Sequence, residues 1–195
     1  MAQELEIEYK TMLTEAEYQL AINKFGLENV AAFTQTNLYF DTAASDLKNQ
    51  HCGLRVRYFQ NAAEATLKIP QNVGLLEVTD KLTLIEAKNA EETGAFPKNT
   101  PAIQEQLQKN GVIVNNLQLL AILTTKRIEQ TIAVGKLALD ESWYAGLHDF
   151  ELELEVQDSQ TSEAEFLTLL KEAGIYFQPA KNKILRAISA QSISN

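Results

Sequence analysis

The chain has 195 residues, of which 45% are hydrophobic, and 26 acidic against 17 Lys and Arg residues give it a formal net charge of −9. This length and apolar content suit one folded domain and exclude a disordered polyelectrolyte. The acidic surplus argues against a protein that coats nucleic acid or an anionic membrane, because both need a basic surface. It leaves room for a local basic site.

Cysteine content and hydropathy indicate the compartment. Cys52 is the single cysteine, so an intramolecular disulfide is excluded and a reducing compartment is favoured. The first ten residues, MAQELEIEYK, are charged where a signal peptide is apolar, and no apolar run approaches the roughly 18 residues of a membrane span. We therefore expect a cytoplasmic protein with neither a membrane nor a nucleic-acid polymer as partner.

Eight segments alternate polar and apolar residues, which is the pattern of strands with one buried face. They cover residues 4–10, 35–41, 53–59, 63–69, 75–82, 121–132, 134–140 and 147–156. Capping boxes at Thr14, Thr83 and Ser162 predict three helices, and Thr100-Pro101 starts a fourth that stops at Gly111. The pattern of residues 181–188 does not decide their secondary structure. Because no linker interrupts the pattern, we expect one α+β domain over residues 1–195.

The predicted strands carry charges on the face opposite their apolar face. Helices that cover the apolar faces leave the charged faces towards solvent in an open sheet, or towards a lumen in a closed one, and closure removes exposed edges. Three sets of charges share a face within one strand: Glu6, Glu8 and Lys10; Arg55 and Arg57; and Glu151, Glu153 and Glu155. Three adjacent carboxylates repel one another unless cations face them.

Counting outwards from each predicted turn gives the residues that face each other across hairpins. A turn between Asn72 and Val73 pairs Lys68 with Glu77, and a turn near Asn61 places Arg55 opposite Lys68. A turn at Ala145-Gly146 places Asp140 opposite Glu151. Opposed like charges are destabilising, so the basic pair suggests a bound anion and the acidic pair a bound cation. Such a face suits a polyphosphate together with a divalent metal such as Mg²⁺ or Mn²⁺.

Glu6-Ile7-Glu8-Tyr9-Lys10 resembles the ExExK signature of the CYTH superfamily, also called triphosphate tunnel metalloenzymes. Further motifs follow in the family's order over nearly the whole chain: Leu54-Arg55-Val56-Arg57, Ala65-Thr66-Leu67-Lys68, Glu77, Arg127, Leu139-Asp140-Glu141, Glu151-Leu152-Glu153-Leu154-Glu155 and Lys183-Ile184-Leu185-Arg186. The resemblance implies a closed eight-stranded antiparallel β-barrel, a tunnel with a charged lumen and amphipathic helices packed outside.

The resemblance also implies roles for individual residues. Triphosphate-binding roles fall on Lys10, Arg55, Arg57, Arg127 and Lys183, and metal-binding roles, for Mg²⁺ or Mn²⁺, on Glu6, Glu8, Asp140, Glu151 and Glu153. In hydrolytic members, residues matching Lys68 and Glu77 activate the attacking water, and a lysine crowded by arginines has a lowered pKa that suits this task. The strand around Glu77 lacks the charged neighbours of many members, and Glu155 fits either the tunnel or the surface.

The expected activity is metal-dependent hydrolysis of a triphosphate, either inorganic tripolyphosphate, thiamine triphosphate or a nucleoside triphosphate. Two alternatives use the same lumen. A class IV adenylyl cyclase makes cyclic AMP from ATP with the ribose 3′-hydroxyl as nucleophile, and a binding protein holds a polyphosphate or nucleotide without turnover. No motif in the sequence identifies the group beyond the triphosphate.

Overall fold

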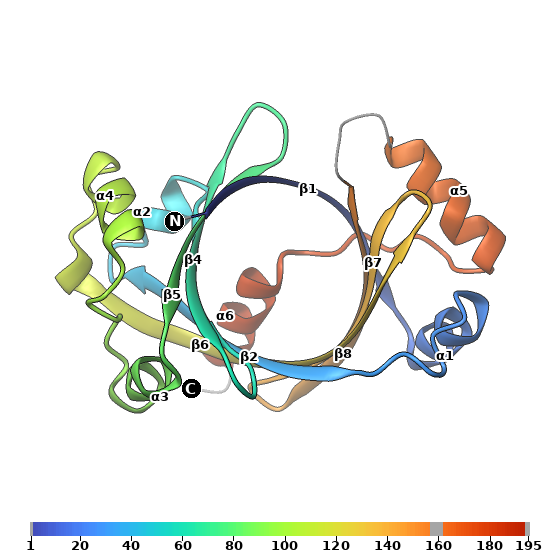
Figure 1. Ribbon diagram of the computed structural model, residues 1–195, viewed down its shortest axis with the longest axis horizontal. Helices are drawn as coiled ribbons and strands as arrows, with labels where there is room; N and C mark the ends of the chain where they lie inside the picture. The colour runs from blue at the N-terminus through green and yellow to red at the C-terminus, as the bar shows by residue number, and fades with distance from the viewer. Residues whose placement is uncertain (1, 157–161, 194–195) are drawn as a thin grey trace.

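Eight antiparallel strands close into a barrel in the computed structural model, which describes residues 2–156 and 162–193. Around the barrel the strands follow the order β1-β5-β4-β3-β2-β6-β7-β8, and β8 pairs again with β1 (Figure 1). The strands are β1 (Ala2–Leu13), β2 (Phe33–Thr42), β3 (Gly53–Tyr58), β4 (Ala63–Pro70), β5 (Leu75–Leu82), β6 (Leu117–Ile132), β7 (Gly135–Tyr144) and β8 (Leu147–Val156). The predicted α+β barrel is confirmed.

Three strands extend by three or more residues beyond one predicted end, because closure gives each a partner on both sides. β1 continues to Leu13 along β8, and β7 continues to Tyr144 at the hairpin with β8. β6 begins at Leu117, opposite Thr42 of β2. The β2–β6 register shifts between Tyr39 and Phe40, so that Leu120 is an extra residue in β6. This bulge breaks the alternation of polar and apolar residues that otherwise reveals a strand.

The described part of the chain has six α-helices and one short 3₁₀-helix, Val114–Asn116. The helices are α1 (Glu15–Lys24), α2 (Asp46–Asn49), α3 (Leu84–Thr93), α4 (Pro101–Lys109), α5 (Glu163–Ala173) and α6 (Lys183–Ile193). The capping boxes predicted at Thr14, Thr83 and Ser162 are present. Helix α2 was not predicted. Its first N–H, of Asp46, donates to Thr42 Oγ1, and the next two, of Leu47 and Lys48, donate to the Asp41 carboxylate near the end of β2.

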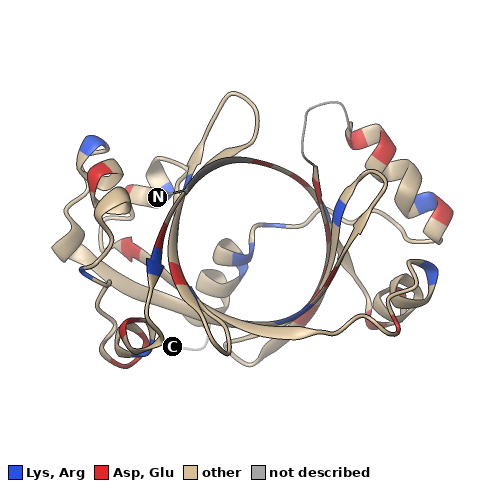
Figure 2. Ribbon diagram, viewed as in Figure 1, with Lys and Arg blue, Asp and Glu red and all other residues tan. Residues whose placement is uncertain are grey.

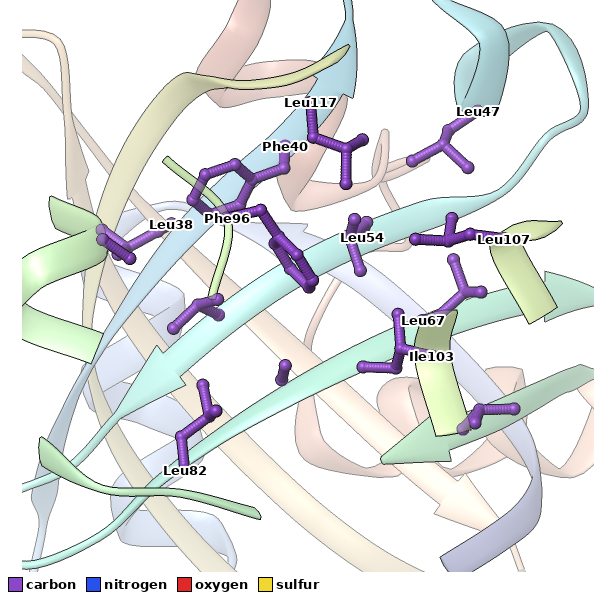
Figure 3. Packing of buried hydrophobic residues seen from close by; sticks show 14 of the residues in the cluster. Leu38, Phe40, Leu47, Leu54, Leu67, Leu82, Phe96, Ile103, Leu107 and Leu117 are labelled. Atoms are coloured by element: carbon purple, nitrogen blue, oxygen red, sulfur yellow. The ribbon is translucent and has the colours of Figure 1, made fainter. Parts of the chain in front are cut away.

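Two hydrophobic cores lie outside the barrel wall. One packs α2, α3 and α4 against β2 to β5, with Phe40, Leu54 and Ile103 fully buried (Figure 3). The other packs α1 and α5 against β1, β7 and β8, around Phe166 and Leu152. Figure 1 shows these helices on two opposite sides of the barrel. The outward residues of the strands therefore supply the folding core and leave the inward face free for polar groups.

Helix α6 differs from the other five because it packs against inward-facing residues. Its Ala187 and Ala190 contact Tyr39, Leu123 and Tyr144, which lie on the inner face of β2, β6 and β7. The preceding segment is tied to β1, since Met12 N donates to Gln178 O at 3.0 Å. Helix α6 thus lies across one end of the barrel, within the ring of strands in Figure 1. This placement brings its first residue, Lys183, to the lumen.

Substituting Gly74 by alanine is expected to destabilise the fold by about 2 kcal/mol or more. Gly74 has φ +72° in the β4–β5 turn, and an added Cβ would lie 2.3 Å from the Glu6 carbonyl oxygen, so a clash adds to left-handed strain. Gly111→Ala is the matched control, because Gly111 has φ +70° and no atom within 4 Å of the added Cβ. Urea unfolding should show the larger loss at Gly74; equal losses would contradict the clash.

Candidate active site

The charged residues predicted from the sequence all line the inner face of the barrel, as the strand registers and, for Lys183, its ion pairs place them. Figure 2 shows that acidic and basic residues both occur along the strands of the barrel. Each predicted residue interacts with another member of the set, either by an ion pair or by electrostatic contact. The set is Glu6, Glu8, Lys10, Arg55, Arg57, Lys68, Glu77, Arg127, Asp140, Glu151, Glu153 and Lys183. This set contributes six acids and six bases to the lumen.

Lys68 lies between two carboxylates at one side of the lumen. Its Nζ is 2.7 Å from Glu77 Oε1 and bonds Glu6 as well. The predicted pairing of Lys68 with Glu77 across the β4–β5 hairpin is confirmed. The expectation that arginines crowd Lys68 is wrong, because its direct partners are acids. Lys68 is thus held in place by two carboxylates, from β1 and β5.

The two carboxylates that share Lys68 have opposite pKa shifts. Burial raises the pKa of Glu6 to about 6, with the carboxylates of Glu8 and Glu77 adding to the rise and Lys68 opposing it. Burial also disfavours the charged form of Glu77, but Lys68 and Arg55 outweigh it and lower the pKa of Glu77 to about 2. At neutral pH Glu77 is therefore firmly ionised, whereas Glu6 is close to its titration range.

The predicted register of the β3–β4 hairpin is wrong by two residues. Arg55 faces Thr66, Arg57 faces Glu64, and Lys68 faces Gly53. The turn centres between Gln60 and Asn61, one residue earlier than expected, since Tyr58 pairs with Ala63. A shift of two keeps every side chain on its predicted face. The opposed basic pair does not exist, so it no longer supports a bound anion.

A basic wall, formed by Arg55, Arg57 and Arg127, supports an anion site on other grounds. Burial, together with repulsion from the adjacent Arg55 and Arg127, lowers the pKa of Arg57 to about 9. Arg57 Nε donates to Asn37 Oδ1 at 2.8 Å, and its nearest carboxylate, Glu64, is 4.0 Å away. Arg55 Nε is buried without a hydrogen-bond partner. Among the described residues, Arg55 and Arg57 thus have no carboxylate closer than 3.9 Å, and guanidinium groups neutralised so weakly favour a polyanion.

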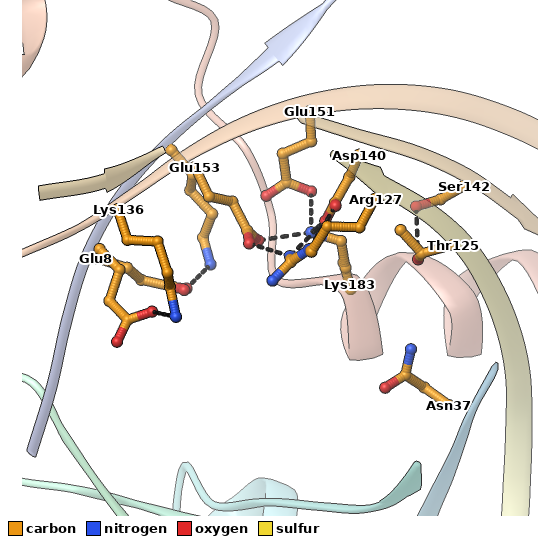
Figure 4. A network of polar contacts seen from close by, with 12 residues as sticks. Glu8, Asn37, Thr125, Arg127, Lys136, Asp140, Ser142, Glu151, Glu153 and Lys183 are labelled. Atoms are coloured by element: carbon orange, nitrogen blue, oxygen red, sulfur yellow. Dashed lines mark hydrogen bonds and ion pairs between the residues drawn. The ribbon is translucent and has the colours of Figure 1, made fainter. Parts of the chain in front are cut away.

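Next to Arg127 of the basic wall, carboxylates of β7 and β8 surround two cations, Arg127 itself and Lys183 (Figure 4). The predicted pairing of Asp140 with Glu151 is confirmed. Arg127 binds Asp140 through two parallel hydrogen bonds, Nε to Oδ1 at 2.7 Å and Nη2 to Oδ2 at 2.6 Å, and also contacts Glu153. Lys183 Nζ lies 2.8 Å from Asp140, 2.9 Å from Glu151 and 2.5 Å from Glu153.

Burial and ion pairing set the charges of this acidic cluster. Burial opposes ionisation of Glu153, but Lys183 and Arg127 outweigh it and hold its pKa well below the ordinary value. The pKa of Asp140 is lowered in the same way, by Arg127 and Lys183 against burial. Glu151 is the exception, since burial dominates and raises its pKa. Its Oε1 is buried without a hydrogen-bond partner.

The donor set suits a hard divalent cation, because carboxylate oxygens are the preferred ligands of Mg²⁺ and Mn²⁺. The unpartnered Glu151 Oε1 is an available acceptor within this set. Among residues 2–156 and 162–193, no three His, Cys, Asp or Glu side chains stand close enough together to hold a metal ion as they are placed. Lys10, Lys68, Arg127 and Lys183 are instead the ion-pair partners of these carboxylates.

Comparison with known proteins identifies the family. A family model described as the CYTH domain matches residues 4–188. The chain belongs to the CYTH domain family. It is 34% identical over 186 residues to the Bacillus subtilis (strain 168) protein named "Putative triphosphatase YjbK", with 95% of each chain covered.

Solved CYTH structures share this fold. A Bacillus halodurans protein named a "putative adenylate cyclase" is 33% identical, with a TM-score of 0.87 over 95% of this chain and 98% of that one. The Hippeastrum protein HpAC1, named a "putative adenylyl cyclase" and described as having a dominant triphosphatase activity, is 22% identical with a TM-score of 0.74. It covers 95% of this chain and 96% of its own. In the described part of this CYTH chain, no helix has the length and apolar character to cross a membrane.

Two polar residues of the CYTH lumen, Arg186 and Asn37, had no role assigned from the sequence. Arg186 of α6 contacts Glu151, and its Nε is 3.3 Å from Asp149 Oδ2. A helical interpretation of residues 181–188 would have placed Arg186 one turn from Lys183. Asn37, the partner of Arg57, was signalled by the alternation of Gln35, Asn37 and Tyr39 in the second predicted strand.

Glu155, whose place in the tunnel or on the surface was left open, pairs with Lys136 at 2.6 Å, and both side chains are over 40% exposed.

Glu6 is expected to make this CYTH protein less stable as pH rises from about 4.5 to about 6. Its folded pKa is raised to about 6 from 4.5, so the native state binds more protons than the unfolded state within this window, and stability falls by up to about 2 kcal/mol. In urea unfolding, the free energy of unfolding of Glu6→Gln should rise relative to that of the wild type by that amount between pH 4.5 and pH 6. Glu155→Gln should follow the wild type; a constant difference for Glu6→Gln would contradict the raised pKa.

Proposed function

We propose that the protein hydrolyses a terminal phosphoanhydride bond of a triphosphate bound inside the barrel, with Mg²⁺ or Mn²⁺. The observation that carries the proposal is the basic wall, in which Arg55 and Arg127 both repel Arg57 and Arg55 Nε is buried without a hydrogen-bond partner. A small anion with several charges would relieve this repulsion at several points. The family and the 34% identity to a protein named as a triphosphatase support the same reaction class.

The binding residues act by neutralising charge on the phosphate chain. Phosphoryl transfer needs mainly positioning and electrostatic stabilisation, and arginine offers planar, paired donors for phosphate oxygens. We assign this role to Arg55, Arg57 and Arg127, and to Lys10 and Lys183 on the side of the acidic cluster. Arg127 is held by two hydrogen bonds to Asp140, so its guanidinium plane is fixed before the substrate arrives.

Lys68 and Glu77 are proposed to position and activate the attacking water. Glu77 stays ionised because Lys68 and Arg55 lower its pKa to about 2 against the effect of burial. It can therefore accept a hydrogen bond from the water while holding the Lys68 ammonium 2.7 Å away. A divalent ion held by Glu6, Glu8, Asp140, Glu151 and Glu153 would supply further neutralisation of the phosphate oxygens.

The experiment is an assay of the purified protein with tripolyphosphate, thiamine triphosphate and ATP, each with Mg²⁺, Mn²⁺ or EDTA, in which phosphate and cyclic AMP are both measured. We expect metal-dependent phosphate release from at least one triphosphate and none with EDTA. Tight binding without turnover of any of the three would contradict hydrolysis and favour a binding protein.

A second candidate function is supported by the Bacillus halodurans relative, which is named as an adenylate cyclase and is 33% identical. In this reaction the ribose 3′-hydroxyl of ATP replaces water as the nucleophile at the same charged wall. Cyclic AMP as the main product from ATP, with little phosphate from tripolyphosphate, would favour this activity over hydrolysis.

A further inference from the structure

Lys183 occupies the point where the three carboxylates of the acidic cluster converge. Its Nζ is within 2.9 Å of Asp140, Glu151 and Glu153, which β7 and β8 direct inwards from neighbouring positions (Figure 4). Asp140 and Glu151 are almost completely buried, with side-chain exposures of 0% and 1%. An ammonium group is thus the local counter-ion of a buried, acid-rich position.

The same position has the chemistry of a divalent cation site. All three residues offer carboxylate oxygens, and Glu151 keeps one buried oxygen, Oε1, without a hydrogen-bond partner. The oxygens stand 2.5 to 2.9 Å from Lys183 Nζ, whereas Mg²⁺ requires about 2.0–2.1 Å. The carboxylates must therefore close in by less than about 1 Å to coordinate a metal there. Lys183 and a metal cannot occupy this point together.

We propose that the Lys183 ammonium group stands where a divalent cation binds in the metal-loaded protein. The cation then displaces the ammonium group from the three carboxylates towards the triphosphate. This inference rests on the metal-binding part of the proposed function. Lys183 is the first residue of α6, so its side chain can turn while the helix stays docked. Arg186 keeps α6 bound to Glu151 and Asp149, and the apolar contacts of Ala187 and Ala190 remain.

Displacement of Lys183 couples the binding of the metal to the binding of the triphosphate. Without a triphosphate, a displaced Lys183 loses three carboxylate partners and stays near the like-charged Arg127. With a triphosphate in the lumen, the freed ammonium gains phosphate oxygens. Metal and triphosphate should each bind more tightly in the presence of the other, and by the same factor, because coupling free energy is reciprocal.

The first test is the affinity for Mn²⁺ without triphosphate, measured by isothermal titration calorimetry. Lys183→Met removes the internal occupant and should bind Mn²⁺ at least about tenfold more tightly than the wild type. Lys136→Met is the matched control, because Lys136 pairs with the half-exposed Glu155 and not with the three carboxylates; it should bind as the wild type does. Equal or weaker binding by Lys183→Met would overturn the inference.

The second test needs no substitution at Lys183. The wild type is treated with an amine-modifying reagent, and the modification rate of Lys183 is followed by mass spectrometry. Mg²⁺ alone should raise this rate several-fold, and Mg²⁺ with tripolyphosphate should lower it again. A rate that Mg²⁺ leaves unchanged would overturn the inference.

The two tests do not depend on turnover. If tripolyphosphate is not hydrolysed but Lys183→Met binds Mn²⁺ more tightly, the proposed reaction fails and the metal position stands. If no variant binds Mn²⁺, both the metal position and this inference fail.

Discussion

Replacing Lys68 by methionine is expected to lower kcat for triphosphate hydrolysis by about 10²- to 10⁴-fold, with a change in KM of only a few-fold. Lys68 contacts Glu6 and Glu77 and lies outside the basic wall, so its loss affects the positioned water more than the bound phosphate chain. Methionine keeps most of the side-chain volume. Steady-state phosphate release with saturating Mg²⁺ measures both constants.

Glu77→Gln should reproduce the loss of kcat, because it removes the carboxylate that holds Lys68 at 2.7 Å. Lys136→Met, at a half-exposed ion pair, serves as the control and should retain wild-type kcat. A Lys68→Met enzyme whose kcat stays within a factor of about three of the wild type would exclude Lys68 from the chemical step.

Replacing Lys183 by methionine is expected to destabilise the metal-free protein by about 3–5 kcal/mol at neutral pH, because it leaves buried carboxylates without their shared cation. Lys183 is itself well buried, with a side-chain exposure of 13%, so solvent screens this interaction little. Urea unfolding in the presence of EDTA measures the loss. Unchanged stability at neutral pH would contradict the assigned ion pairs.

The loss of stability of Lys183→Met relative to the wild type should decrease in acid. In the wild type Lys183 helps to lower the folded pKa values of Asp140 and Glu153 against burial. A lowered carboxyl pKa contributes stability that is present above the unfolded pKa and is lost as pH falls through the folded pKa. The variant lacks much of this contribution, so the two proteins should converge as the pH is lowered below about 4. A pH-independent difference would indicate a packing defect instead.

The sequence was enough to predict which residues face the lumen, because inward and outward residues alternate along each strand of a closed barrel. The alternation holds at the predicted charged positions. Glu6, Arg57 and Glu153 each lie on the predicted inner face. The pairing of residues across each hairpin was harder to predict, because it depends on the position and type of the turn. Pro70 and Gly74 defined the β4–β5 turn correctly, whereas Gln60-Asn61 contains neither residue type, and its centre was misplaced by one position.

The lumen end of the site was harder to predict because distant segments build it. The apolar side of α6 is matched by Tyr39, Leu123 and Tyr144, which come from three different strands. Local periodicity in residues 181–188 cannot reveal such a surface. The role of Lys183 was therefore predicted only by resemblance, and that of Arg186 was left open. Helix α2 is four residues long, and its N–H groups donate to Thr42 and Asp41 of the preceding strand, which leaves little signal within its own sequence.

The central claim is that the basic wall binds a triphosphate, and calorimetric titration of tripolyphosphate in EDTA tests it most directly. The wild type should bind, and the double variant Arg55→Gln/Arg57→Gln should bind at least about 100-fold more weakly, since each lost charge-assisted hydrogen bond costs about 1.5–3 kcal/mol. The same affinity for both proteins would contradict a triphosphate site at this wall.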